Sequence, residues 1–188
     1  MDSAPVDWKN SENNFFMNPR WPTDVQNFFK LEIKKFISQQ LIDSSIFIPT
    51  SGTTAKELRD TKIVWLNKEA FLKAAQSVGE YFQFSSSDRV AASLPNFHVG
   101  GLSQQARQAV WGQQLFQFQA AWNPELFFQF LKDHKITHAS LVPTQLFDLV
   151  ELGVCAPPSI KDIFIGGGVL GHELWTRATA LGCEPTLK

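Results

Sequence analysis

The alternation of short apolar runs with helix-like segments constrains this fold more than any other feature of the sequence. Strands are expected near residues 46–49, 62–66, 89–94, 114–118, 137–142 and 162–165. Between them, apolar residues recur at helical spacing, as in residues 23–41, 67–82, 124–134 and 143–152. Strands that alternate in this way with helices are typical of βαβ units. The sequence therefore predicts an α/β fold in which a largely parallel sheet carries flanking helices.

Composition limits the classes of partner. The chain has 188 residues, of which 44% are hydrophobic and 19% charged, so we expect a folded domain at residues 23–188 behind an irregular N-terminal arm at residues 1–22. With 17 basic and 18 acidic side chains, the net charge is −1, which favours neither nucleic acid nor an anionic membrane. A small-molecule partner is expected. No leader peptide or membrane span is evident, so a cytoplasmic location is expected.

Three loops follow predicted strands, and ligands of parallel sheets bind beyond the carboxyl ends of strands. TSGTTAK at residues 50–56 has small and hydroxyl side chains that let backbone N–H groups approach a phosphate, although a plain polar turn has the same composition. PNFHVGG at residues 95–101 offers His98 beside two glycines, and the alternative is a structural histidine. The third loop, residues 166–168, is a triple glycine that suits either a flat ligand ring or a tight turn.

Together these loops resemble the adenylate-forming superfamily of acyl-CoA synthetases. TSGTT looks like the phosphate loop of that superfamily, and SLPNFHVGGLS at residues 93–103 is similar to its acyl-site motif. THASLVPTQL at residues 137–146 and IFIGGG at residues 163–168 match two further segments in the expected order. Within the superfamily, the loops look most like the o-succinylbenzoate-CoA ligases of menaquinone biosynthesis. The resemblance implies a partial AMP-binding domain at residues 23–188.

The resemblance also implies roles for individual residues. The β- and γ-phosphates of ATP would be held by Thr50, Ser51, Gly52, Thr53 and Thr54, with Thr53 or Thr54 also helping to place Mg²⁺. The acyl group of o-succinylbenzoate would be bound by His98, Gly100, Gly101 and Leu102, with Thr144 near the same cleft. The adenine and the acyl adenylate would be flanked by Gly166, Gly167 and Gly168. Coenzyme A would be the second co-substrate.

The sequence departs from the family pattern after the phosphate loop. The family continues with Gly, any residue, Pro and Lys, whereas this chain has Ala55, Lys56, Glu57 and Leu58. Either Lys56 or, after a short insertion, Lys62 would be the lysine of this loop, and Lys62 and His98 are the candidate catalytic residues. The family pattern also continues beyond Lys188, so we expect a truncated form that lacks the C-terminal domain, self-associates through exposed apolar surface and has low or no activity alone. Two other hypotheses stay open, namely another acyl- or aryl-CoA ligase and a non-catalytic ligand-binding or interaction module.

Overall fold

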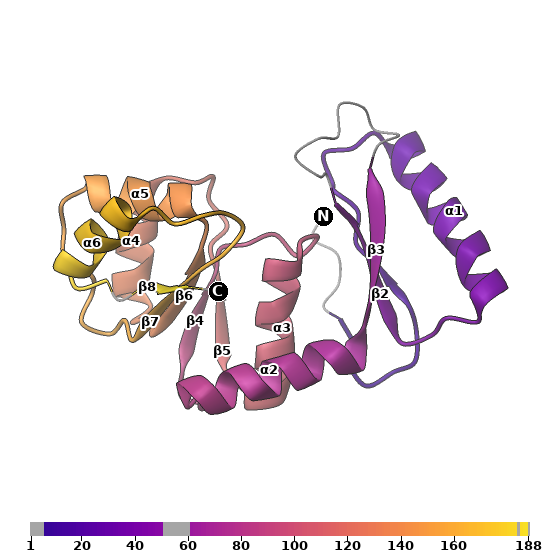
Figure 1. The fold of residues 1–188 in the computed structure, drawn as a ribbon, viewed down its shortest axis with the longest axis horizontal. Coiled ribbons are helices and arrows are strands. Elements are labelled where there is room, and N and C mark those ends of the chain that lie inside the picture. Colours follow the sequence, from indigo (N-terminus) through magenta and orange to yellow (C-terminus); the bar gives the residue numbers. More distant parts are fainter. Residues whose placement is uncertain (1–5, 51–60, 184, 188) are drawn as a thin grey trace. The chain divides into compact units, whose positions relative to one another are not determined.

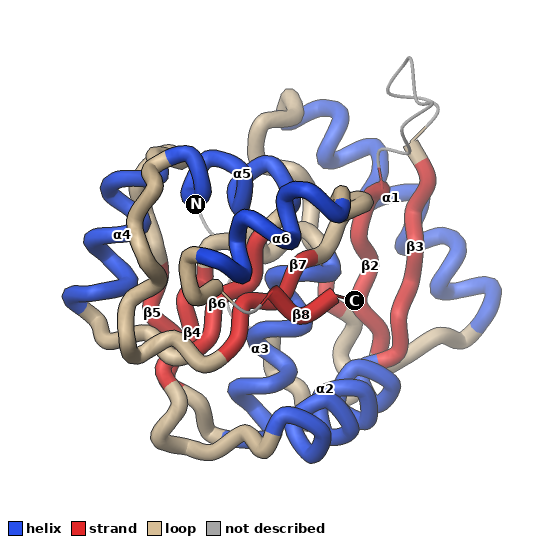
Figure 2. The backbone as a smooth tube through the Cα atoms, turned by 60° about the vertical axis from the view of Figure 1, so that its left-hand side comes forward, coloured by secondary structure: helices blue, strands red, loops and turns tan. Residues whose placement is uncertain are grey.

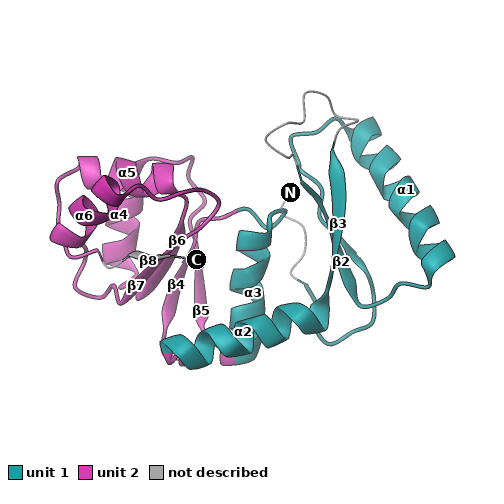
Figure 3. Ribbon diagram, viewed as in Figure 1, with its two compact units in different colours: residues 1–82, 95–110 teal, residues 83–94, 111–188 magenta. Residues whose placement is uncertain are grey.

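A computed structural model describes residues 6–50, 61–183 and 185–187, and it divides the chain into two compact units. Unit 1 consists of residues 1–82 and 95–110, and unit 2 consists of residues 83–94 and 111–188 (Figure 3). Each unit has its own sheet and its own buried apolar clusters. The chain therefore crosses between the units more than once, and each unit is described by itself below.

Unit 1 contains a three-stranded sheet in the order β1-β2-β3. Figure 1 labels β2 and β3 of this sheet. Strand β1 (Asn14–Phe15) lies parallel to β2 (Ser45–Thr50), and β2 pairs antiparallel with β3 (Lys62–Asn67). A parallel connection needs a crossover of a dozen or more residues, usually with a helix, and residues 51–61 are too short for one. The predicted strands at 46–49 and 62–66 are therefore confirmed, but they form a hairpin outside the parallel sheet.

The helices of unit 1 cover both faces of this sheet. Ile46 and Ile48 point to the face where α2 (Lys68–Phe82) and α3 (Val99–Trp111) pack, and Phe47 points to the face covered by α1 (Thr23–Gln40). This division follows from the alternation of side chains along a strand. Because β2 is covered on both sides, it is a continuous apolar run in the sequence.

A buried ammonium group helps to fasten the N-terminal arm to the rest of unit 1. Lys68 is 1% exposed, and its Nζ donates to the backbone oxygen of Asp7 at 2.8 Å and to Oδ1 of Asn10 at 2.7 Å. Burial lowers the pKa of Lys68, while the charges of Asp7 and Glu12 oppose this shift. The arm also contains strand β1, so part of residues 1–22 has regular structure.

Unit 2 contains a five-stranded sheet in the order β5-β4-β6-β7-β8, in which every neighbouring pair is parallel (Figure 2). The predicted parallel sheet is confirmed here. Its strands are β4 (Arg89–Ala92), β5 (Gln114–Gln117), β6 (His138–Leu141), β7 (Asp162–Ile165) and β8 (Pro185–Leu187).

One face of the unit 2 sheet is covered by α4 (Pro124–Asp133), α5 (Pro143–Glu151) and α6 (His172–Ala180) (Figure 1). These helices bury an apolar cluster against alternate strand residues, including Ala91, Ala139 and Ile163. Helix α4 begins as the sequence predicts, because Oδ1 of Asn123 accepts from the N–H of Leu126 at 2.8 Å. Among the described residues, no helix is long and apolar enough to cross a membrane.

Candidate active site

The triple glycine lies at the carboxyl edge of the unit 2 sheet, beside the start of α5. The N–H of Gly166 donates to the backbone oxygen of Leu141 at 3.0 Å, so the end of β7 is tied to the end of β6. Gly167 has φ +77°, and a Cβ there would lie 3.3 Å from Cγ1 of Val142. A Cβ at Gly168 would lie 3.4 Å from the ring of Pro143. Two predicted segments, residues 142–144 and 166–168, are therefore brought together.

This edge can accept a flat or anionic ligand. A Cβ at Gly166 would meet no heavy atom within 4 Å, so its backbone is open to a planar ring. Thr144 is exposed in the first turn of α5, where free N–H groups favour negative charge. The side chain of Gln145 accepts from the N–H of Val142 at 3.0 Å and holds this helix start in place. The open backbone at Gly166 is compatible with the adenine and the acyl adenylate that the resemblance predicts for this edge, and the assignment stays a prediction.

In unit 1, the hairpin brings two predicted site residues together. Thr50 and Lys62 are register partners at the ends of β2 and β3, and the Thr50 hydroxyl lies 3.4 Å from the backbone oxygen of Lys62. Lys62 is exposed. The remaining residues of the predicted phosphate loop, Ser51, Gly52, Thr53, Thr54 and Lys56, lie outside the described residues. The hairpin therefore places the positive charge of Lys62 at the base of this loop.

His98 lies at the start of α3 in unit 1, where its backbone oxygen accepts from the N–H of Leu102 at 3.1 Å. Its exposed ring lies against Phe97, with ring centroids 4.5 Å apart. Partial burial lowers the pKa of His98, so the imidazole is neutral at pH 7 and can form hydrogen bonds without an ionic partner. Its position favours contact with a ligand more than a role in the core.

The residues that follow His98 turn progressively into the core of unit 1. Gly100 is half-buried, Gly101 is buried, and Leu102 is 0% exposed within the cluster formed with β2 and α2. Leu102 packs in that core, and its predicted role in shaping an acyl pocket stays a prediction.

Sequence reasoning missed a set of buried polar side chains on α3. They are Gln104, Gln105 and Arg107, each less than a tenth exposed. Burial lowers the pKa of Arg107 to about 10, which leaves it charged at neutral pH. Polar residues on the buried side of a helix are uncommon, and a run of polar residues in the sequence does not say which of them are buried. A buried guanidinium is suited to hold an anion or a carbonyl oxygen.

No metal centre is built from the side chains that the structure describes. Among them, no group of three or more His, Cys, Asp or Glu residues could hold an ion. Thr53 and Thr54, the candidates for Mg²⁺ bound through ATP, are outside the described ranges. The assignment of Mg²⁺ to this loop stays a prediction.

Comparison with known proteins supplies the family. The profile of the AMP-binding enzyme family matches residues 14–188, which is most of the chain. The chain belongs to the AMP-binding enzyme family. Curated members of this family that resemble it include 2-succinylbenzoate–CoA ligase of Bacillus licheniformis, 28% identical over 145 residues, and that of Staphylococcus epidermidis, 30% identical over 131 residues. These alignments cover 77% and 70% of this chain, and 29% and 27% of the relatives.

Solved structures of AMP-binding enzymes have the same fold. O-succinylbenzoate coenzyme A synthetase from Bacillus subtilis in complex with AMP matches with a TM-score of 0.68 and 26% identity, over 76% of this chain and 29% of that one. The same enzyme in complex with ATP and magnesium ion matches with a TM-score of 0.66 and 28% identity, over 73% and 28% of the two chains. The chain thus spans less than a third of the length of these relatives.

Proposed function

We propose that this chain forms the part of an o-succinylbenzoate-CoA ligase that binds ATP and the acid. Such a ligase joins the acid to the α-phosphate of ATP with loss of pyrophosphate, and the thiol of CoA then displaces AMP. The observation that carries the proposal is the match to the AMP-binding enzyme family over residues 14–188, together with the packing of residues 166–168 against residues 142–144 at the carboxyl edge of the unit 2 sheet. The names of the similar ligases support o-succinylbenzoate as the acid.

The chemistry needs positioning and charge neutralisation more than covalent participation by the protein. The phosphate chain would be bound by the loop that begins at Thr50, with Lys62 neutralising negative charge at its base. Mg²⁺, when bound with ATP, would supply further positive charge to the phosphate oxygens. Gly166 would allow the nucleotide to lie against the backbone, and the neutral imidazole of His98 would hydrogen-bond to the acid.

We propose binding, with little or no turnover, for the 188 residues alone. The alignments cover less than a third of the relatives' length, so these residues represent a minor part of the whole enzyme. The residues assigned to the site would bind and orient the ligand, and His98, whose pKa is lowered by partial burial, is the one imidazole among the assigned residues that the structure describes. Thioester formation by this chain alone would contradict the proposed inactivity and leave the assignment of the site intact.

The first test is calorimetric titration with a non-hydrolysable mimic of o-succinylbenzoyl adenylate. We expect saturable binding that His98→Ala and Lys62→Ala each weaken by about tenfold, the loss of one charge-assisted or well-placed hydrogen bond. Lys73→Ala is the matched control, because this exposed lysine on α2 pairs with Glu69 and is not part of the site. Absence of binding by a folded chain would refute the proposal.

The acid is tested with two further mimics. A benzoyl-adenylate mimic lacks the succinyl chain and the second, free carboxylate, and a long-chain acyl mimic lacks the free carboxylate and the aromatic ring. Equal affinity for all three would show that the site recognises the adenylate and does not select o-succinylbenzoate, which would favour another acyl- or aryl-CoA ligase. Tighter binding of the o-succinylbenzoyl mimic, by tenfold or more, is the expected result.

A further inference from the structure

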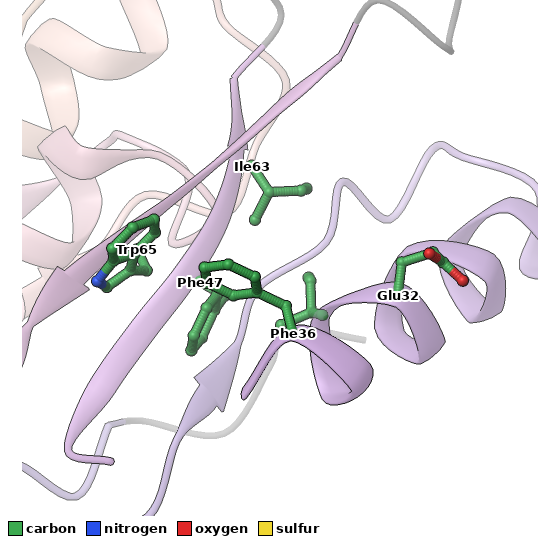
Figure 4. A pocket seen from close by; sticks show the side chains of 6 residues that line it. Glu32, Phe36, Phe47, Ile63 and Trp65 are labelled. Carbon is green, nitrogen blue, oxygen red and sulfur yellow. The ribbon is translucent and has the colours of Figure 1, made fainter. Parts of the chain in front are cut away.

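Unit 1 contains a cavity of about 280 Å³ between α1 and the β2–β3 hairpin (Figure 4). None of the residues that line it is assigned above to ATP or the acid. Its lining comes from one helix and two strands, namely from Glu32, Ile33, Phe36, Phe47, Ile63 and Trp65. Five of these six side chains are apolar, and three of them are aromatic.

The aromatic rings leave surface open to a ligand. Phe36 and Trp65 form a tilted pair with centroids 5.3 Å apart and an interplanar angle of 52°. They are 37% and 51% exposed, whereas Phe47 is buried and stacks on Phe15 with centroids 5.5 Å apart. The cavity is therefore bounded on its inner side by the buried ring of Phe47 and on its outer side by the exposed rings of Phe36 and Trp65.

Glu32 is the only charged residue of the lining. It lies one turn before Phe36 on α1, so both side chains are on the same face of the helix. Its Oε1 accepts from Nζ of Lys35 at 2.7 Å, and its side chain is 48% exposed. An exposed pair of this kind is weak, so the carboxylate keeps most of its capacity to attract a second cation.

We propose that this cavity binds an organic cation of the alkylammonium class. The faces of aromatic rings carry negative potential and attract ammonium groups within about 6 Å of the ring centroid. Phe36 and Trp65 present partly exposed rings to the cavity, Glu32 supplies the one negative charge of its lining, and the apolar walls suit the methyl groups of a substituted ammonium ion. The volume holds a substituted ammonium ion with a ring or short chain. An anion is disfavoured because it would face Glu32.

The test uses benzyltrimethylammonium as the probe, with benzyl alcohol as the neutral comparator and phenylacetate as the anionic one. Binding is measured by calorimetry and by ligand-observed NMR. We expect the cation to bind about threefold to fivefold more tightly than either comparator, since a cation–π contact at a partly exposed ring corresponds to roughly this factor in affinity. Equal binding of benzyl alcohol and the cation would overturn the proposal, because it would show an apolar pocket without charge selection.

Variants locate the binding. Trp65→Leu keeps an apolar side chain but removes the aromatic face, and we expect it to weaken binding of the cation by about threefold to fivefold. Glu32→Gln keeps the shape and removes the charge, with an expected loss of about threefold. Phe28→Leu is the matched control, because Phe28 is 59% exposed on the same helix and does not line the cavity. Circular dichroism checks that each variant folds, and a cation affinity unchanged by both cavity variants would refute the site.

A second copy of the chain is the competing occupant, since exposed apolar residues lie on α1 and β3. Sedimentation at several protein concentrations distinguishes the two. A monomer that binds the cation supports the proposal. Self-association that Trp65→Leu abolishes, with cation binding lost as protein concentration rises, would show that the cavity is a protein interface and would overturn it.

Discussion

Replacing Lys161 by Met tests how far a buried carboxylate in unit 2 depends on one ammonium group. Asp88 is 1% exposed, and its Oδ1 lies 2.8 Å from Nζ of Lys161, while its Oδ2 accepts from the N–H of Ser85 at 2.7 Å. Burial alone would raise the pKa of Asp88. Hydrogen bonds from Lys161 and Ser85, together with the charges of His138 and Lys161, outweigh burial and hold the pKa below its ordinary value.

The expected loss for Lys161→Met is about 2 kcal/mol in the free energy of unfolding. Removing one partner of a fully buried ion pair costs about 3–5 kcal/mol. Two features reduce this value, because the Lys161 side chain is 57% exposed and Asp88 keeps its bond from Ser85. With a slope of about 2 kcal/mol per molar urea, the midpoint of urea unfolding should fall by about 1 M. Equilibrium unfolding followed by circular dichroism measures this shift.

Lys73→Met is the matched control for this prediction. The Lys73–Glu69 pair has an N–O distance of 2.7 Å, close to that of the Lys161–Asp88 pair, but its side chains are 75% and 70% exposed. We expect its loss to be within the error of the measurement, because water screens the charges. Equal losses for the two variants would refute the reasoning from burial.

The dependence of the free energy of unfolding on pH provides a second check on Lys161→Met. The pKa of Asp88 is lowered in the folded protein, so its contribution is present above about pH 4 and is lost as the pH falls through the folded value. The difference between the wild type and Lys161→Met should therefore shrink in acid. A difference that stays constant down to the lowest pH at which the protein folds would show that the variant acts through packing.

Three further predictions concern unit 2. Burial lowers the pKa of His138, although the charges of Asp88 and Asp162 oppose this shift, so the free energy of unfolding should fall below about pH 6.5 as the unfolded chain takes up a proton. In His138→Gln, the midpoint of urea unfolding should change less between pH 7.5 and 5.5 than in the wild type. The same pH dependence in both proteins would contradict this prediction. Gly167→Ala should lower the free energy of unfolding by about 2 kcal/mol, because Gly167 has a positive φ and a Cβ there would make a close contact. Gly153→Ala should lower it by about 1 kcal/mol, because Gly153 also has a positive φ but a Cβ there meets nothing within 4 Å. Urea unfolding compares the two variants, and equal losses would exclude an effect of the contact. Asn123→Ala should lower the free energy of unfolding by about 1 kcal/mol, because it removes the hydrogen bond that Asn123 accepts from the first turn of α4. Thermal unfolding measures this loss, and an unchanged melting temperature would mean that the cap is not needed.

Local sequence patterns predicted most of the helices and strands, although not β1 or β8. The apolar run of β2 and the residues Asn123-Pro124 before α4 each specify structure within a few neighbouring residues, so they could be recognised without a fold. The loops at residues 95–101 and 166–168 were recognised for the same reason. The triple glycine alone does not say which member needs a positive φ. That requirement falls on Gly167 because the start of α5 packs against it.

Contacts between residues that are far apart in the sequence were decided only by the tertiary structure. The sequence predicted two strands around the TSGTTAK loop, and only the pairing of Thr50 with Lys62 shows that they form an antiparallel hairpin. Asp88 and Lys161 are 73 residues apart and have no shared signal in the sequence. The same holds for Glu32 and Trp65, which line one cavity from a helix and a strand. Periodicity reports which face of an element is buried, whereas the choice of partner depends on packing of the whole chain.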